Sequence, residues 1–93
     1  MEFSIPADHP SLPGHFPGRP VVPGVLLLDR VLEAIEAAGA APGALRLPQV
    51  KFLRSLLPGQ AARIELQAQD ARVWRFRILR GDELIASGEV AAL

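Results

Sequence analysis

The chain is organised around the stretch Gly14-His15-Phe16-Pro17-Gly18-Arg19-Pro20-Val21-Val22-Pro23-Gly24 and the apolar segment that follows it, from residue 25 to about residue 38. Prolines and glycines on both sides of His15 restrict its backbone, which predicts a loop of fixed shape. The apolar segment has helical spacing, and the glycines and proline of residues 39–43 predict its end. Asp29 lies in the second turn of this helix. We predict that His15 and Asp29 are the two halves of an acid–base site.

The composition is that of a small globular domain, and we expect one domain over residues 1–93. The chain is 49% apolar, and ten basic residues balance ten acidic ones, so its formal net charge is zero. A neutral chain gives no electrostatic reason to expect nucleic acid or an anionic membrane as a partner. With no cysteine, and with two histidines that lack metal-ligand spacing, we expect no metal. The absence of a signal peptide or a long apolar run predicts a cytoplasmic protein.

The apolar pattern predicts one helix and an antiparallel sheet. Alternation of apolar and polar residues, or an extended apolar pattern, marks five strands, at residues 1–5, 45–53, 63–69, 73–79 and 84–90. Pro48 indicates an edge or a bulge in the second of them. Turns are predicted at Pro58-Gly59 and over residues 80–83. This order predicts an α+β fold in which the sheet curls around the single central helix.

The predicted helix has two unlike faces. One face is apolar and is formed by Leu27, Val31, Ala34, Ile35 and Ala38. The opposite face carries Asp29, Glu33 and Glu36, with Val25, Leu26 and Leu32 beside them. We therefore expect a sheet on one side of the helix and a second covering surface on the other. Taken singly, Asp29 also fits a solvated acid and His15 an ordinary loop residue, and His9 is a weaker candidate base.

The start of the helix supplies a third component of the site. Pro23-Gly24 precedes the first helical turn, whose N–H groups have no partner within the helix and lie at the positive end of its dipole. Gly24 has no side chain, so a ligand oxygen could approach its N–H closely. An oxyanion donor, a rigidly held histidine and an acid on the helix are the groups needed to form and stabilise an enolate.

These residues carry a resemblance to a known family. Residues 15–26 resemble the signature loop of the 3-hydroxyacyl-[acyl carrier protein] dehydratases of fatty acid synthesis, and residues 51–59 and 82–90 resemble two further stretches of that family. The resemblance implies the hot-dog fold and a homodimer whose two sheets join, with a trimer of dimers as a further assembly. It also implies acyl carrier protein as the partner, no cofactor, and a place in fatty acid, polyketide or aryl-polyene synthesis.

The resemblance also assigns roles to residues of the site. His15 of one subunit would face Asp29 of the other and remove the α-proton of a 3-hydroxyacyl thioester. The Gly24 N–H would polarise the thioester carbonyl, and the Val21 carbonyl would orient the His15 ring. Asp29 would protonate the departing 3-hydroxyl, which leaves a trans-2-enoyl thioester. Further contacts to the substrate are expected from Phe16, Pro23 and Val25.

Two departures from the family pattern keep alternatives open. The acid is Asp29 where the commoner branch has Glu, and Arg30 follows it and could pair with it. A hot-dog domain that binds acyl thioesters without turning them over is therefore the first alternative, and an acyl thioesterase is the second. Acyl carrier protein is acidic, so the candidate docking residues are basic: Arg19, Arg46, Lys51 and Arg54.

Overall fold

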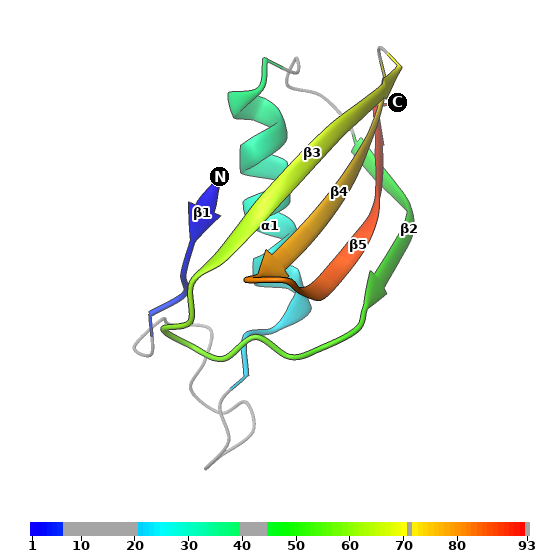
Figure 1. The fold of residues 1–93 in the computed structure, drawn as a ribbon. Coiled ribbons are helices and arrows are strands. Elements are labelled where there is room, and N and C mark those ends of the chain that lie inside the picture. The colour runs from blue at the N-terminus through cyan, green and yellow to red at the C-terminus, as the bar shows by residue number, and fades with distance from the viewer. Residues whose placement is uncertain (7–20, 40–44, 71, 93) are drawn as a thin grey trace.

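The computed structural model describes residues 1–6, 21–39, 45–70 and 72–92. The elements are β1 (Glu2–Phe3), α1 (Gly24–Ala37), β2 (Leu45–Phe52), β3 (Ala62–Asp70), β4 (Val73–Arg80) and β5 (Glu83–Ala92). The strands form one sheet in the order β1-β3-β4-β5-β2, and every neighbouring pair is antiparallel. The sheet curves around α1, which lies along its inner side (Figure 1). The predicted α+β hot-dog architecture is confirmed.

Strand register decides which side chains meet the helix. Leu66, Phe76 and Gly88 are paired across β3, β4 and β5, and so share the inner face. Glu65, Arg77 and Ser87 are paired one residue out of phase and share the outer face. Because successive side chains of a strand point to opposite faces, the register determines which side chains face the helix and which face away from it. The inward and outward positions predicted for β3 and β4 agree with this register.

The core lies between α1 and the inner face of the sheet. Its largest fully buried side chains are Ile5, Val31, Ile35, Leu56, Phe76, Ile78, Ile85 and Val90. Each such side chain stabilises the fold by about 1.5–3 kcal/mol relative to an exposed one. Leu27, Val31, Ala34 and Ile35 are buried, as the helical spacing predicted. Ala38 is the exception, because α1 ends at Ala37 and Ala38 is its exposed C-cap.

β2 is an edge strand of the described sheet and pairs with β5 alone. Its register against β5 shifts between Arg46 and Gln49, on either side of Pro48. Proline has no N–H to donate to the ladder, so an irregularity is expected there. The predicted edge and bulge are both confirmed.

The predicted turns are also present. Gly59 and Gly81 have φ values of 82° and 60°, a region that a residue with a side chain rarely enters. Gly59 lies in the β2–β3 connection and Gly81 in the β4–β5 hairpin. Within the described ranges, no helix combines the length and the apolar character needed to cross a membrane.

Candidate functional site at the start of the helix

The start of α1 is anchored by the residues that precede it. Val22 is buried, and its N–H donates a hydrogen bond to the carbonyl oxygen of Leu56 with an N···O distance of 2.8 Å. Pro23 follows in an extended conformation, with φ −60° and ψ 144°, and has no side-chain oxygen to cap the helix. Leu56 is itself fully buried, so this bond fixes the helix start against the β2–β3 connection. Val21 and Pro23, two of the predicted site residues, are half-buried.

The first N–H groups of α1 are available at its end. Leu26 N–H reaches the Pro23 carbonyl at 3.0 Å, but Gly24 N–H has no hydrogen-bond acceptor among the described residues. The helix dipole places partial positive charge at the same point. A carbonyl oxygen brought to Gly24 would therefore gain a hydrogen bond and be polarised. The role of Gly24 as an oxyanion donor stays a prediction, with which this open N–H is compatible.

The ring of Phe52 occupies the space that a side chain at position 24 would take. A Cβ atom built on Gly24 would lie 2.8 Å from Phe52 Cζ and 3.0 Å from Cε1. Non-bonded carbons prefer about 3.5–4.0 Å, so a methyl group there would displace the ring. Gly24 is the first helical residue, so the contact with the ring, and not the backbone conformation, restricts the residue at this position. The sequence predicts that a ligand oxygen uses this space, and it did not identify Phe52, because the contact joins distant parts of the chain.

Asp29 is exposed on α1, and its neighbour Arg30 is engaged elsewhere. Arg30 Nη1 donates a hydrogen bond to Glu33 Oε1 at 2.7 Å. Residues three apart on a helix share a face, whereas adjacent residues do not. The pairing of Arg30 with Asp29 that the sequence left open is thus not the one formed, and the guanidinium is held one turn away by Glu33.

An apolar flank borders Asp29. Val25 is 63% exposed, and Leu28 and Leu32, three and seven residues further on, are half-buried on the same side of α1. Phe52, which is 51% exposed, lies against the beginning of this side at Gly24. Nothing in the described part of the chain covers these four residues fully. Of the three residues that the helix pattern placed beside the acids, Val25 and Leu32 lie on this uncovered side, whereas Leu26 is buried in the core.

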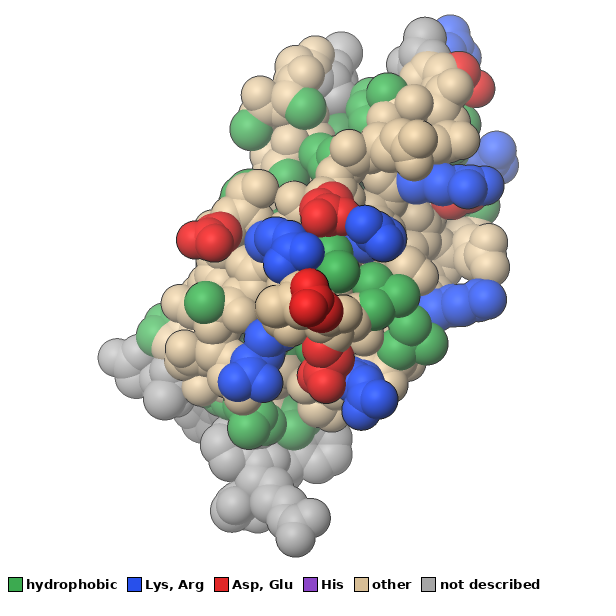
Figure 2. All heavy atoms as spheres, viewed as in Figure 1, with side chains coloured by type: hydrophobic (Ala, Val, Ile, Leu, Met, Phe, Trp, Pro, Cys, Tyr) green, Lys and Arg blue, Asp and Glu red, His purple; other side chains and the backbone are tan. Residues whose placement is uncertain are grey.

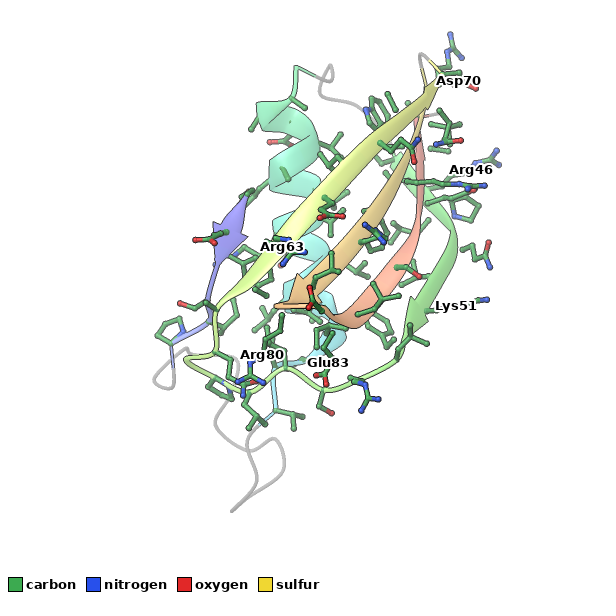
Figure 3. All side chains as sticks on the ribbon, viewed as in Figure 1. Arg46, Lys51, Arg63, Asp70, Arg80 and Glu83 are labelled. Carbon is green, nitrogen blue, oxygen red and sulfur yellow. The ribbon has the colours of Figure 1, made fainter. Side chains whose placement is uncertain are left out.

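The predicted docking cations lie in different settings. Arg46 and Lys51 are exposed and project from β2 at the sheet edge (Figure 3). Arg54 is also exposed, and its Nε lies 3.7 Å from Glu83 Oε2 across the β4–β5 turn. Arg19 lies outside the described residues, as do His15, Phe16 and His9. No cluster of three potential metal ligands occurs within the described ranges.

The outer face of the sheet is a separate, polar surface. Acidic and basic side chains alternate over it (Figure 2). A hollow of about 590 Å³ is lined by charged residues of this surface, among them Lys51, Glu65, Arg75, Arg77 and Glu89. Arg77 is hydrogen-bonded to Glu65, and Arg75 Nε lies 3.3 Å from Glu89 Oε1. The hydrogen bond from Arg77, supported by Arg63, holds the pKa of Glu65 below its usual range. Because these charges pair with one another on the face away from α1, the hollow is not the candidate site.

Family membership follows from comparison with known proteins. A profile described as ApeI-like, ApeI dehydratase, matches residues 1–89. The chain belongs to the ApeI-like dehydratase family. The dehydratase family predicted from the signature loop is thereby confirmed.

Three relatives with known names are all 3-hydroxyacyl-[acyl-carrier-protein] dehydratases. The 3-hydroxyacyl-[acyl-carrier-protein] dehydratase FabZ of Desulforamulus reducens is 33% identical over 94% of this chain and 70% of its own length. The FabZ of Pelotomaculum thermopropionicum is 37% identical over 74% of this chain and 55% of its own length. The FabZ of Magnetococcus marinus is 32% identical over 95% of this chain and 63% of its own length. This member of the ApeI-like family therefore spans 55–70% of the length of these relatives.

Solved structures support the fold of this ApeI-like chain. The dehydratase heterocomplex ApeI:P from Xenorhabdus doucetiae superimposes with a TM-score of 0.81 and 22% identity, covering 97% of this chain and 81% of that one. A mutant of the fluoroacetyl-CoA-specific thioesterase FlK superimposes with a TM-score of 0.66 and 23% identity, and the match covers 98% of this chain and 81% of the FlK chain. Dehydratases and thioesterases thus share this fold, so the fold by itself does not choose between the two reactions.

Proposed function

We propose that this chain acts as a homodimer that removes water from a 3-hydroxyacyl thioester carried on acyl carrier protein. The observation that carries the proposal is the unfinished site at the start of α1: a Gly24 N–H with no acceptor among the described residues, an exposed acid at Asp29, and an uncovered apolar flank between them. Gly24 and Asp29 are five positions apart along the helix, an axial rise of about 7.5 Å. The carbonyl oxygen and the β-hydroxyl of a 3-hydroxyacyl thioester lie closer together than this, and a hydrogen bond at each end spans the remainder.

In the proposed reaction His15 removes the α-proton of the thioester. The electron pair moves toward the carbonyl oxygen, which accepts a hydrogen bond from Gly24 N–H at the positive end of α1. Asp29 then donates a proton to the β-hydroxyl as the bond from the β-carbon to oxygen breaks. Water leaves, and a trans-2-enoyl thioester remains. The Val21 carbonyl orients the His15 ring, and Phe16, Pro23 and Val25 contact the substrate.

A second subunit is the proposed cover of the apolar flank. Leu28 and Leu32 are half-buried and Val25 is 63% exposed, and the edge strand β2 has an unpaired side in the described sheet. An edge strand is a template for pairing with another strand, so two sheets can join there. The partner would bring its His15 to Asp29 and remove the carboxylate from solvent. Further assembly into a trimer of dimers, a cytoplasmic location and a single domain over residues 1–93 stay predictions.

The binding-only alternative was favoured by the departures from the family pattern at Arg30 and Glu33. In the structure these two residues pair with each other at 2.7 Å, which supports the view that Arg30 does not neutralise Asp29. A thioesterase would need an activated water or a carboxylate nucleophile, and no separate feature of the described site favours that reaction. The pathway, fatty acid or polyketide and aryl-polyene synthesis, is proposed from the family alone.

Near-ultraviolet absorbance tests the proposed reaction directly. The protein is mixed with a 3-hydroxyacyl thioester and, separately, with the trans-2-enoyl product, beside His15→Ala and Asp29→Asn. We expect interconversion by the wild type and a loss of about 10²–10⁴-fold in each variant, the usual contribution of a positioned acid or base. Binding of the acyl thioester with no conversion in either direction would contradict the proposal and favour the binding-only domain.

A further inference from the structure

Phe52 occupies an unusual position for an aromatic side chain. It is the last residue of β2, it pairs with Ala86 of β5, and it shares the inner face of the sheet with Val50. Of the other aromatic side chains on that face, Phe76 is fully buried and Trp74 is half-buried. Phe52 is nevertheless 51% exposed. It contributes less to the core than its size allows, so its place calls for another explanation.

The ring of Phe52 is directed at the backbone of the helix start. Its Cζ, Cε1 and Cε2 atoms all lie within 3.2 Å of the point where a Gly24 Cβ would be. The ring tip therefore closes one side of the Gly24 peptide, whose N–H has no acceptor among the described residues. An apolar wall beside an N–H donor keeps water from competing for it, and a hydrogen bond is stronger where the local dielectric is low.

We propose that Phe52 forms a wall of the thioester-binding pocket and selects substrates that are unbranched at the α-carbon. The proposal rests on the function proposed above, because it takes Gly24 N–H as the donor to the thioester carbonyl. The α-carbon is bonded to that carbonyl carbon, so a group attached to it lies close to whatever borders Gly24. A ring in that space leaves little room for an additional methyl group. Removing the ring would provide the room and also let water reach the donor.

Two consequences distinguish this role from simple packing. In Phe52→Ala, kcat/KM for an unbranched 3-hydroxyacyl thioester should fall about tenfold, and the preference for unbranched over 2-methyl-branched substrate should shrink by about the same factor, as for a methyl group in an apolar pocket. Phe52→Leu, which keeps an apolar side chain, should lie between Phe52→Ala and the wild type. Packing alone would lower both substrates equally and leave their ratio unchanged.

The experiment measures kcat/KM for both thioesters in the wild type, Phe52→Ala, Phe52→Leu and the control Leu47→Ala. Leu47 is a 39% exposed apolar residue of the same edge strand, before the bulge, so it reports any general effect of trimming β2. Light scattering on each variant shows whether the assembly is intact. The proposal is supported if the substrate ratio changes in Phe52→Ala, but not in Leu47→Ala, at unchanged mass.

Other outcomes overturn it in recognisable ways. Equal ratios in Phe52→Ala and Leu47→Ala would show that Phe52 does not border the substrate. A loss of activity that accompanies a lower molecular mass in Phe52→Ala would assign the residue to the subunit interface instead. If the wild type converts neither thioester, the proposed dehydratase activity is refuted, and the role of Phe52 is refuted with it. The wild-type measurement alone distinguishes this outcome from the others.

Discussion

Single residues decide whether the proposed acid can work. Asp29 lies beside a cation in sequence, but Arg30 is bonded to Glu33 at 2.7 Å, which directs the guanidinium along the helix. An i,i+3 pair on an exposed helix face contributes about 0.2–0.5 kcal/mol, enough to favour one rotamer of a long side chain. A small local interaction therefore leaves Asp29 free of a permanent counter-ion from its own helix turn.

The proposed base can be distinguished from the second histidine by substitution. His15→Ala should lower the dehydration rate by about 10²–10⁴-fold, because general-base catalysis contributes that much, whereas His9→Ala should change it little. The measurement is the initial rate of enoyl thioester formation at saturating substrate. Losses of similar size in both variants would refute the assignment of His15.

At the scale of elements, close approach between strands limits what the inner face of the sheet can hold. A Cβ atom on Gly88 would collide with the Gln49 carbonyl oxygen of β2 and would lie 2.8 Å from the Phe76 ring. Glycine at this position lets β2 approach β5 beside the bulge at Pro48. The edge strand that the dimer is proposed to use thus depends on a single missing side chain in its neighbour.

Gly88→Ala should destabilise the fold through this contact. Overpacking of a filled site costs about 1–3 kcal/mol, which for a chain of this size lowers Tm by roughly 5–20 °C. Ser87→Ala, at the neighbouring position in β5 and on the outer face, is the matched control and should shift Tm little. Thermal unfolding followed by circular dichroism measures both. Equal Tm values for Gly88→Ala and Ser87→Ala would contradict the predicted collision.

The paired charges of the outer face predict a specific pH dependence. Arg77 holds the pKa of Glu65 below its ordinary value, so the pair stabilises the fold above the unfolded pKa of about 4.3 and loses this effect as pH falls through the folded pKa. Glu65→Gln should therefore lower Tm slightly at pH 7 and not at pH 3. A Tm difference between wild type and Glu65→Gln that is the same at both pH values would show that the ion pair does not contribute.

On the scale of the whole molecule, the chain leaves a helix flank and a strand edge uncovered on the same side as its proposed site. A domain of about 93 residues has a thin core, and association is a common way to bury such surfaces. If each site takes His15 from one subunit and Asp29 from the other, a monomer cannot complete it. Assembly and activity should then be inseparable.

Mixing two inactive variants tests this sharing. His15→Ala and Asp29→Asn should each be inactive as homodimers, but a heterodimer of the two has one intact site and one doubly altered site. Random exchange of subunits should restore about one quarter of the wild-type activity. Light scattering should also give about twice the 10.0 kDa chain mass, or a multiple of it. A stable, folded monomer, or a mixture as inactive as its components, would refute the shared site.

The sequence by itself determined the helix, the strands, their order along the chain and the family. Each depends on local periodicity, on turn residues such as Gly59 and Gly81, or on the contiguous signature at residues 15–26, so each can be read along the chain. The candidate roles of Gly24 and Asp29 were found in the same way, from the helix start and from one helix face. The roles given to all of the site residues stay predictions, and His15 and Phe16 also lie outside the described ranges.

Only the tertiary structure decided which side chains meet. The contact of Phe52 with Gly24 joins the end of β2 to the start of α1, and the ion pair of Arg54 with Glu83 joins two separate turns. The choice of Glu33 over Asp29 by Arg30 depended on side-chain geometry that spacing alone left open. Such contacts are set by how the sheet curls around the helix. The periodicity along the chain does not encode the distance between two elements that folding brings together.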